Sequence, residues 1–187
     1  MIVFWIFLGI LVILIFWAVS KYNLFIKLRN NRENAFANID VQLKQRHDLI
    51  PQLVATVKGY ASHEKETLEM VVNARAGAIN AKSIDEKIVA ENALTSALAG
   101  LKVTVEAYPN LKANSNFMQL QEEISDIENK LAAVRRFFNT TTKELNTAIE
   151  MFPGNIIAGM FGFKKEMMFD LGEVERKNLE KVPEINF

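Results

Sequence analysis

The N-terminal twenty residues most constrain what this chain can fold into, because none of them is charged and residues 2–19 are almost wholly Ile, Val, Leu, Phe and Trp. A helix over residues 2–19 is about 27 Å long at 1.5 Å per residue, which is close to the hydrocarbon thickness of a bilayer. Aromatic and basic residues bracket such helices at the membrane–water interface. Here the membrane-flanking residues are Trp5, Trp17, Lys21 and Tyr22. The sequence therefore predicts a single transmembrane anchor over residues 1–20.

A secretory signal peptide is the competing interpretation, since residues 18–20 have the small-x-small form of a cleavage site. Signal peptides usually start with basic residues and have a shorter apolar run, whereas no Lys or Arg precedes this one. We therefore favour an uncleaved anchor. The positive-inside rule then predicts an N-terminus outside and a cytoplasmic body, because four basic residues follow the apolar stretch: Lys21, Lys27, Arg29 and Arg32.

The composition excludes several classes of function. The chain has no cysteine, so a disulfide framework, a thiolate zinc site and a cysteine nucleophile are all ruled out. Its 22 Lys and Arg balance 22 Asp and Glu, which argues against a nucleic-acid partner, since such proteins need an excess of positive charge. Only two histidines are present, and His47 and His63 are sixteen positions apart, so one helix cannot bring both to a metal.

Helical periodicity is the only pattern beyond the anchor. Apolar residues from Phe36 to Tyr60 fall three, four or seven apart, and no turn signal separates them from the anchor. We therefore predict one helix from the membrane to about Gly77, with a local kink at Pro51, which cannot donate to the carbonyl of His47.

Two further helices are predicted by their start and stop signals. Ser83 and Glu86 have the spacing of a capping box, which starts a helix reaching about Ala107. Tyr108-Pro109-Asn110 is a break, and a third helix starts near Asn114 or Ser115 and ends before Phe152-Pro153-Gly154. The predicted fold class is all-α: a single transmembrane helix (1–20) that continues into an antiparallel bundle of long helices (21–153), followed by an apolar and aromatic segment with a charged tail (154–187).

The segment after the third helix combines glycine, phenylalanine and methionine, which provide an adaptable apolar surface. Three interpretations stay open: it covers the end of its own bundle, enters the inner-leaflet interface, or docks on a neighbouring subunit. The candidate interface residues are Ile156, Ile157, Met160, Phe161, Phe163, Met167, Met168 and Phe169.

Four charged residues are candidates for a polar layer inside the bundle: Arg46, Glu106, Glu128 and Arg135. Paired charges in a helical seam commonly fix helix register, which is the interpretation we favour. The alternative is acid–base or di-metal chemistry by the carboxylates. The Glu-x-x-His element of ferritin-like centres is missing from the sequence.

Three blocks of residues make the sequence resemble the LemA family of bacterial membrane proteins. The first block contains Arg46, Asp48-Leu49-Ile50-Pro51, Leu53-Val54, Val57-Lys58-Gly59-Tyr60 and Glu64. The second contains Glu106, Tyr108-Pro109 and Leu111-Lys112-Ala113. The third contains Glu128-Asn129-Lys130, Arg135-Arg136, Asn139, Phe152-Pro153 and Phe161-Gly162-Phe163. Phe138 and Leu145 depart from the family pattern, in which Tyr-Asn pairs are common. The resemblance implies a single-pass protein of the bacterial inner membrane with a bundle of long helices, and it implies no known catalysis.

From these features we expect a membrane-anchored helical scaffold or adaptor without catalytic activity or cofactor. Its partners would be the lipid bilayer and further copies of itself, because striped helices with apolar ends favour homo-oligomers. The alternative function is a membrane-tethered enzyme or metal-binding bundle that uses the buried Glu and Arg layer.

Overall fold

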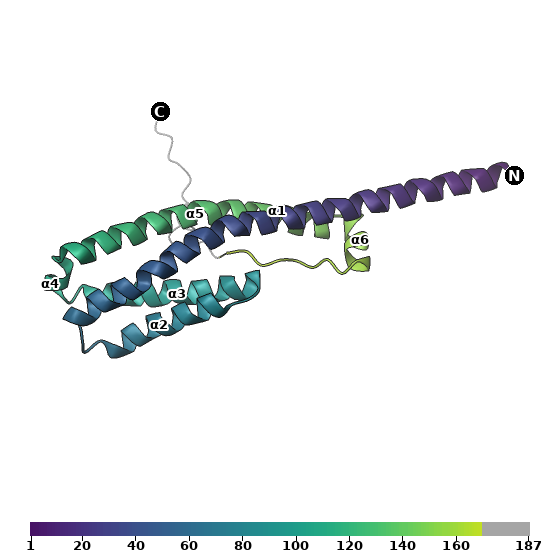
Figure 1. Ribbon diagram of the computed structural model, residues 1–187. Coiled ribbons are helices and arrows are strands. Elements are labelled where there is room, and N and C mark those ends of the chain that lie inside the picture. The colour runs from purple at the N-terminus through teal and green to yellow at the C-terminus, as the bar shows by residue number, and fades with distance from the viewer. Residues whose placement is uncertain (170–187) are drawn as a thin grey trace, which may run out of the picture. The chain divides into compact units, whose positions relative to one another are not determined.

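The computed structural model describes residues 1–169, and every regular element in that range is a helix (Figure 1). In chain order the elements are α1 (Ile2–Tyr60), α2 (Lys65–Asn80), α3 (Ile84–Val105), α4 (Pro109–Lys112), α5 (Ser115–Glu150) and α6 (Gly154–Met160). The predicted all-α fold class, with an apolar N-terminal helix continuing into a helical bundle, is confirmed. The charged tail that the sequence suggests lies outside the described residues from 170 onward.

The described residues form two compact units, to which α1 and α5 both contribute. The anchor unit consists of residues 1–36 and 137–168, and the bundle unit consists of residues 37–136 together with Phe169. These units are defined by contacts, whereas the division at residues 20 and 153 suggested by the sequence follows composition.

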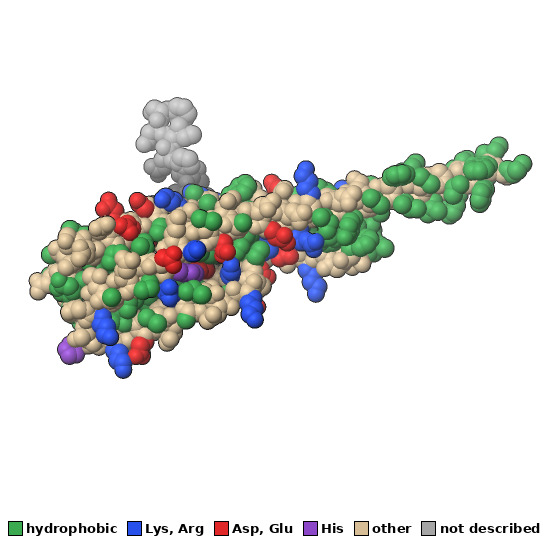
Figure 2. All heavy atoms as spheres, viewed as in Figure 1, with side chains coloured by type: hydrophobic (Ala, Val, Ile, Leu, Met, Phe, Trp, Pro, Cys, Tyr) green, Lys and Arg blue, Asp and Glu red, His purple; other side chains and the backbone are tan. Residues whose placement is uncertain are grey.

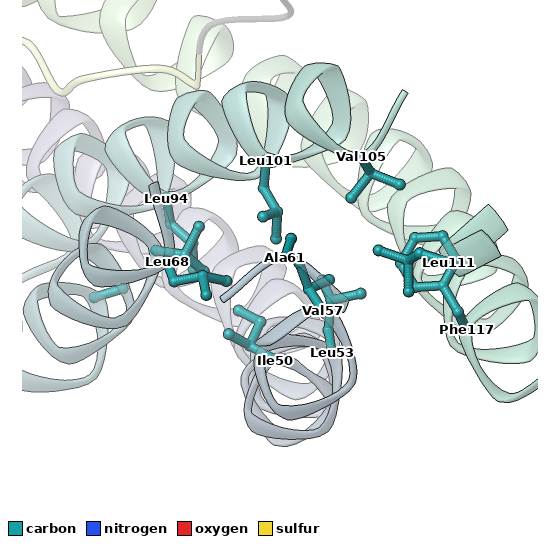
Figure 3. Packing of buried hydrophobic residues seen from close by; sticks show 12 residues of the cluster. Ile50, Leu53, Val57, Ala61, Leu68, Leu94, Leu101, Val105, Leu111 and Phe117 are labelled. Carbon is teal, nitrogen blue, oxygen red and sulfur yellow. The ribbon is translucent and has the colours of Figure 1, made fainter. Parts of the chain in front are cut away.

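In the bundle unit, the consecutive long helices run in alternating directions, and α2 and α3 pack along each other (Figure 1). Their shared core contains side chains from every helix of the unit (Figure 3). Its buried residues are Ile50, Leu53, Val57, Ala61, Leu68, Val71, Ala78, Leu94, Leu101, Val105, Leu111 and Phe117.

One prediction is wrong: the first helix does not continue to Gly77 but ends at Tyr60, and α2 begins at Lys65. In an uninterrupted helix, Leu68 would lie about 27 Å beyond Ile50 along the axis. The turn instead brings α2 back, so that Leu68 and Val71 enter the same core as Ile50. Burial of these apolar side chains therefore outweighs the loss of a few helical hydrogen bonds at the turn.

Pro51 lies inside α1, as the periodicity predicts. Proline has no N–H group, so the carbonyl of His47 lacks its usual helical donor. The Nε of Arg75 on α2 donates to that carbonyl oxygen over 2.8 Å. A side chain of the neighbouring helix thus replaces the hydrogen bond that Pro51 removes.

The predicted boundaries of the later helices are confirmed by local hydrogen bonds. At the start of α3, the Ser83 hydroxyl accepts from the Glu86 amide over 3.1 Å, and the Glu86 carboxylate accepts from the Ser83 amide over 3.4 Å, which completes the capping box. The break at 108–110 contains the start of the short α4, with Pro109 in its first turn. The Asn114 side chain accepts from the Phe117 amide over 3.0 Å at the start of α5.

The anchor unit combines a bare apolar helix with a small core. Hydrophobic side chains cover the N-terminal stretch of α1 (Figure 2), and none of the side chains in its most apolar 18-residue window is buried. This stretch is a candidate membrane span. Helix α3 is also long and apolar enough to span a membrane, but it places Leu94 and Leu101 in the bundle core.

Candidate functional site

A buried charged centre lies in the bundle unit, and Arg46 of α1 is its cation. Arg46 stands between Leu43 and Ile50 in the apolar stripe of α1, so its side chain points into the bundle, where it is fully buried. Its Nη1 donates to Glu128 of α5 over 2.6 Å and to the hydroxyl of Thr95 of α3 over 3.2 Å. Its Nη2 donates to the carboxylate of Glu91, also on α3. One guanidinium therefore connects three helices.

Glu91 is the buried anion of this centre, with 1% of the residue exposed. Ile88 and Leu94 lie three positions on either side of it and are both buried, so helical geometry places Glu91 on the same inward face. Its second carboxylate oxygen lies 2.7 Å from Nε2 of His47. Burial raises the pKa of Glu91, but the hydrogen bond with His47 and the charge of Arg46 together lower it further, and the pKa lies below its ordinary value of 4.5.

This arrangement keeps a buried ion pair tolerable. An isolated charge in a protein interior costs several kcal/mol, and the cost is offset only when hydrogen bonds and an opposite charge satisfy it. Arg46 and Glu91 bond each other, and Glu128, Thr95 and His47 occupy further donor or acceptor positions, while Nε of Arg46 has no hydrogen-bond partner among the described residues. The charged centre is therefore suited mainly to holding helices together by electrostatic contacts.

The structure brings together two of the four residues proposed as a polar layer, Arg46 and Glu128. The Glu106 carboxylate lies elsewhere, on the surface, where it accepts from Nζ of Lys112 over 2.5 Å; this ammonium lowers the pKa of Glu106. Arg135 is half-buried on α5, and its guanidinium lies 5.1 Å from the ring centre of Phe169. The centre therefore lacks both Glu106 and Arg135 of the predicted layer, and its second acid is Glu91.

Sequence reasoning missed Glu91, Thr95, His47 and Arg75 as members of this region. A signal for Glu91 was present: a single acid three residues from Ile88 and three from Leu94 interrupts an otherwise apolar face. Arg46 interrupts the stripe of α1 in the same way. Two opposite charges at inward positions of neighbouring helices indicate a buried pair.

A groove of about 680 Å³ adjoins the centre between α3 and α5. Apolar side chains form much of its lining, including Leu98, Leu101, Phe117 and Met118. Glu128 also lines it and keeps 34% of its side chain exposed while bonding Arg46. The groove thus connects solvent to the edge of the charged centre.

The candidate interface residues all lie in or after α6, and they divide into buried and exposed sets. Ile157 and Phe169 are buried, Phe163 is half-buried, and the others are exposed: Ile156, Met160, Phe161, Met167 and Met168. Among the membrane-flanking residues, Trp5 is exposed, whereas Trp17, Lys21 and Tyr22 are half-buried. The segment therefore covers part of its own unit and leaves a second apolar face uncovered.

Within residues 1–169, no group of three His, Asp or Glu side chains is placed to hold a metal ion. The carboxylates of the charged centre, Glu91 and Glu128, both bond Arg46.

Comparison with known proteins gives a consistent family. The sequence model of the LemA family matches residues 35–187. Protein LemA of Metamycoplasma hominis is 28% identical over 181 residues, covering 95% of this chain and 82% of the relative. Magnetosome protein MamQ of Magnetospirillum gryphiswaldense is 23% identical over 175 residues, and magnetosome protein MamQ 2 of Paramagnetospirillum magneticum is 21% identical over 175 residues. Both matches cover 80% of this chain but only 64% of the relative. With most of its length matched, the chain belongs to the LemA family.

Proposed function

We propose that this protein is a membrane-anchored helical scaffold that associates with copies of itself and has no catalytic activity. In this proposal, residues 1–20 remain in the bilayer of the bacterial inner membrane. The bundle unit stands on the cytoplasmic side, because basic residues directly follow the anchor.

The observation that carries the proposal is the way the buried charges are used. Arg46 and Glu91 are both sequestered from solvent and bond each other, and the same guanidinium also holds α5 through Glu128. A catalytic acid or base needs access to a substrate, whereas a register-fixing pair needs burial and good geometry. The charged centre supports a role in holding the bundle in one arrangement.

The groove between α3 and α5 is the surface that we propose for self-association. Its lining combines apolar side chains with the charged residues Lys102, Glu106 and Glu122. Protein interfaces also combine apolar and charged groups. The groove is bounded by two long helices, α3 and α5, so a helix of a second copy could pack along it. A second copy of the chain is the partner that we propose, because most oligomeric proteins are homo-oligomers.

The test is the particle mass of the full-length chain in detergent, for the wild type and two tryptophan variants. Ala99→Trp places a bulky side chain in the lining of the groove, while Ala93→Trp places it at an exposed position of α3 outside the groove. We expect a discrete particle of several 21.2 kDa chains for the wild type and for Ala93→Trp, and a smaller particle for Ala99→Trp. A wild-type monomer, or equal masses for both variants, would contradict self-association through the groove.

The alternative is a metal-dependent activity. Glu106, Glu122 and Glu128 line the same groove, although within residues 1–169 they do not form a group placed to hold one metal ion. Carboxylates on facing helices are the ligands of di-metal bundles. Metal analysis of the purified full-length chain separates the two functions, since stoichiometric metal would support the alternative and its loss in Glu122→Gln would assign the site.

A further inference from the structure

Helix α6 has one buried face and one apolar face that is uncovered. Ile157 and Ala158 are buried together with Phe25, Leu145 and Ile149. On the other side, Ile156 and Met160 are 53% and 73% exposed, and Phe152, in the turn before the helix, is 78% exposed. Met151 before the helix and Phe161 after it are also mostly exposed. A run of large exposed apolar side chains on one short segment marks an interaction surface.

The residues that α6 packs against lie at the end of the candidate membrane span. Its buried cluster includes the half-buried Trp17, Ala18 and Tyr22. The ring centre of Phe161 lies 4.8 Å from that of Tyr22. Gly154 allows the close approach to the end of α5, because a Cβ there would lie 3.0 Å from the carbonyl oxygen of Ala148, while it would be in ordinary contact with Cζ of Phe25 at 3.5 Å. Contacts with residues 17–25 of α1 therefore set the position of α6 along the axis of the anchor helix.

This position along the anchor corresponds to the membrane surface if the anchor spans the bilayer. The uncharged stretch ends at Ser20, so Trp17 and Ala18 lie within its last turn, and Tyr22 lies about 5 Å beyond Val19 at 1.5 Å per residue. Interfacial helices place their apolar face about 5–10 Å into the boundary between headgroups and acyl chains. The uncovered side chains of α6 fall in this same layer.

Charge in this part of the chain suits an anionic membrane surface. Residues 21–29 and 161–168 contain the basic residues Lys21, Lys27, Arg29, Lys164 and Lys165 and the single acid Glu166, a difference of five minus one, or +4. Glu166 itself is paired with Arg32 over 3.1 Å, and Lys165 is paired with Glu150 of α5 over 2.6 Å. Lys164 is exposed beside Phe163 and free to reach lipid phosphates.

We propose that the uncovered face of α6 inserts into the interfacial layer of the bilayer and forms a second lipid contact beside the anchor, with Lys164 at the headgroup phosphates. This inference rests on the membrane span of the proposed function. Continuity with the apolar anchor makes lipid the occupant: Trp17 and Ala18 belong both to the anchor and to the cluster that seats α6. The contact would hold the anchor unit at the surface at two places.

The test uses single cysteines, which the cysteine-free chain allows without other changes. Met160→Cys and Ile156→Cys carry an environment-sensitive fluorophore in the full-length chain, reconstituted in vesicles of phosphatidylethanolamine and phosphatidylglycerol. Met70→Cys replaces an exposed methionine of α2 that does not line the groove between α3 and α5, and it is the matched control in the bundle unit. Leu11→Cys reports on the anchor itself. Quenching is measured with nitroxide lipids labelled near the headgroup or deep in the acyl chain, and with aqueous iodide.

We expect the labels at 156 and 160 to be quenched by the shallow nitroxide at least about twofold more than the label at 70, and to be protected from iodide. Equal nitroxide quenching at 70, 156 and 160 would overturn the inference. Protection from iodide without nitroxide quenching would also overturn it, because a protein surface would then cover α6. If the deep nitroxide quenches the label at 11 while the labels at 156 and 160 are unaffected, the anchor stands and only the second contact fails. If the labels at 11, 156 and 160 all escape nitroxide quenching, the membrane span of the proposed function fails as well.

Discussion

The Nε of Arg75 on α2 donates a 2.8 Å hydrogen bond to the main-chain carbonyl oxygen of His47 on α1, the carbonyl that Pro51 leaves without a helical donor. A proline in a helix interior removes one hydrogen bond and leaves a carbonyl to be satisfied by another group. Here the group comes from the helix that folds back onto α1. The pair therefore couples a local defect in one helix to the position of its neighbour.

This coupling gives a double-mutant prediction. Arg75→Ala should lower the free energy of unfolding by about 1–2 kcal/mol, because it leaves the half-buried carbonyl unpaired. In a Pro51→Ala background the amide of residue 51 can donate to His47 again, so the same Arg75→Ala change should cost clearly less. Urea unfolding of the four chains in mild detergent, followed by far-UV circular dichroism, measures the difference. Equal costs in both backgrounds would show that Arg75 does not act through this carbonyl.

Removing one partner of the buried pair of Arg46 and Glu91 should lower the free energy of unfolding by a larger amount. Arg46→Met leaves the carboxylate of Glu91 buried without its main cation, which should cost about 3–5 kcal/mol. Replacing both residues by Met should cost less than the sum of the single changes, because no uncompensated charge then remains. Glu106→Gln serves as the control, since this exposed carboxylate bonds Lys112 at the surface and the change should leave the free energy of unfolding almost unchanged.

The lowered pKa of Glu91 predicts how its contribution depends on pH. Because the folded pKa lies below the ordinary value of 4.5, the unfolded chain takes up a proton before the folded chain as pH falls. The stabilisation by ionised Glu91 is therefore complete above about pH 4.5 and is lost as pH falls through the folded pKa. The difference in unfolding free energy between wild type and Glu91→Gln should shrink over this acidic range. A constant difference from neutral pH to the acidic limit would contradict it.

Gly154 and Gly159 of α6 form a matched pair for a packing prediction. A Cβ on Gly154 would lie 3.0 Å from the carbonyl oxygen of Ala148, whereas nothing lies within 4 Å of a Cβ on Gly159. Gly154→Ala should therefore weaken the seating of α6 by about 1–3 kcal/mol, while Gly159→Ala should be neutral or stabilising by up to about 1 kcal/mol. Amide hydrogen exchange of residues 150–163 measures both. Unchanged protection in Gly154→Ala would mean that α6 is not seated as described.

Local signals predicted much of the fold. The capping box at Ser83, the break at Pro109 and the long α5 are encoded within a few residues of each boundary, so they are visible in the sequence. The turn at 61–64 is different. It contains no proline, and the glycine just before it, Gly59, costs only about 1 kcal/mol inside a helix. The chain turns there because Leu68 and Val71 gain a core by folding back, which is a tertiary effect.

The candidate site was predictable only in part for a similar reason. Arg46 and Glu128 belong to blocks that carry the family resemblance, and in the structure Nη1 of Arg46 lies 2.6 Å from Oε1 of Glu128. Glu91 lies outside those blocks, and its importance depends on which helix faces Arg46. Whether Glu91 or Glu106 lies next to Arg46 depends on how the helices pair, which a helical period alone does not specify.

The intact mass of the chain recovered from carbonate-washed membranes tests the central claim most directly. The claim is that residues 1–20 stay in the lipid and hold the bundle unit at its surface. It predicts the full 21.2 kDa chain in the membrane pellet, with the N-terminal apolar stretch still attached. A shorter chain that begins after Ser20 and appears in the wash would contradict it.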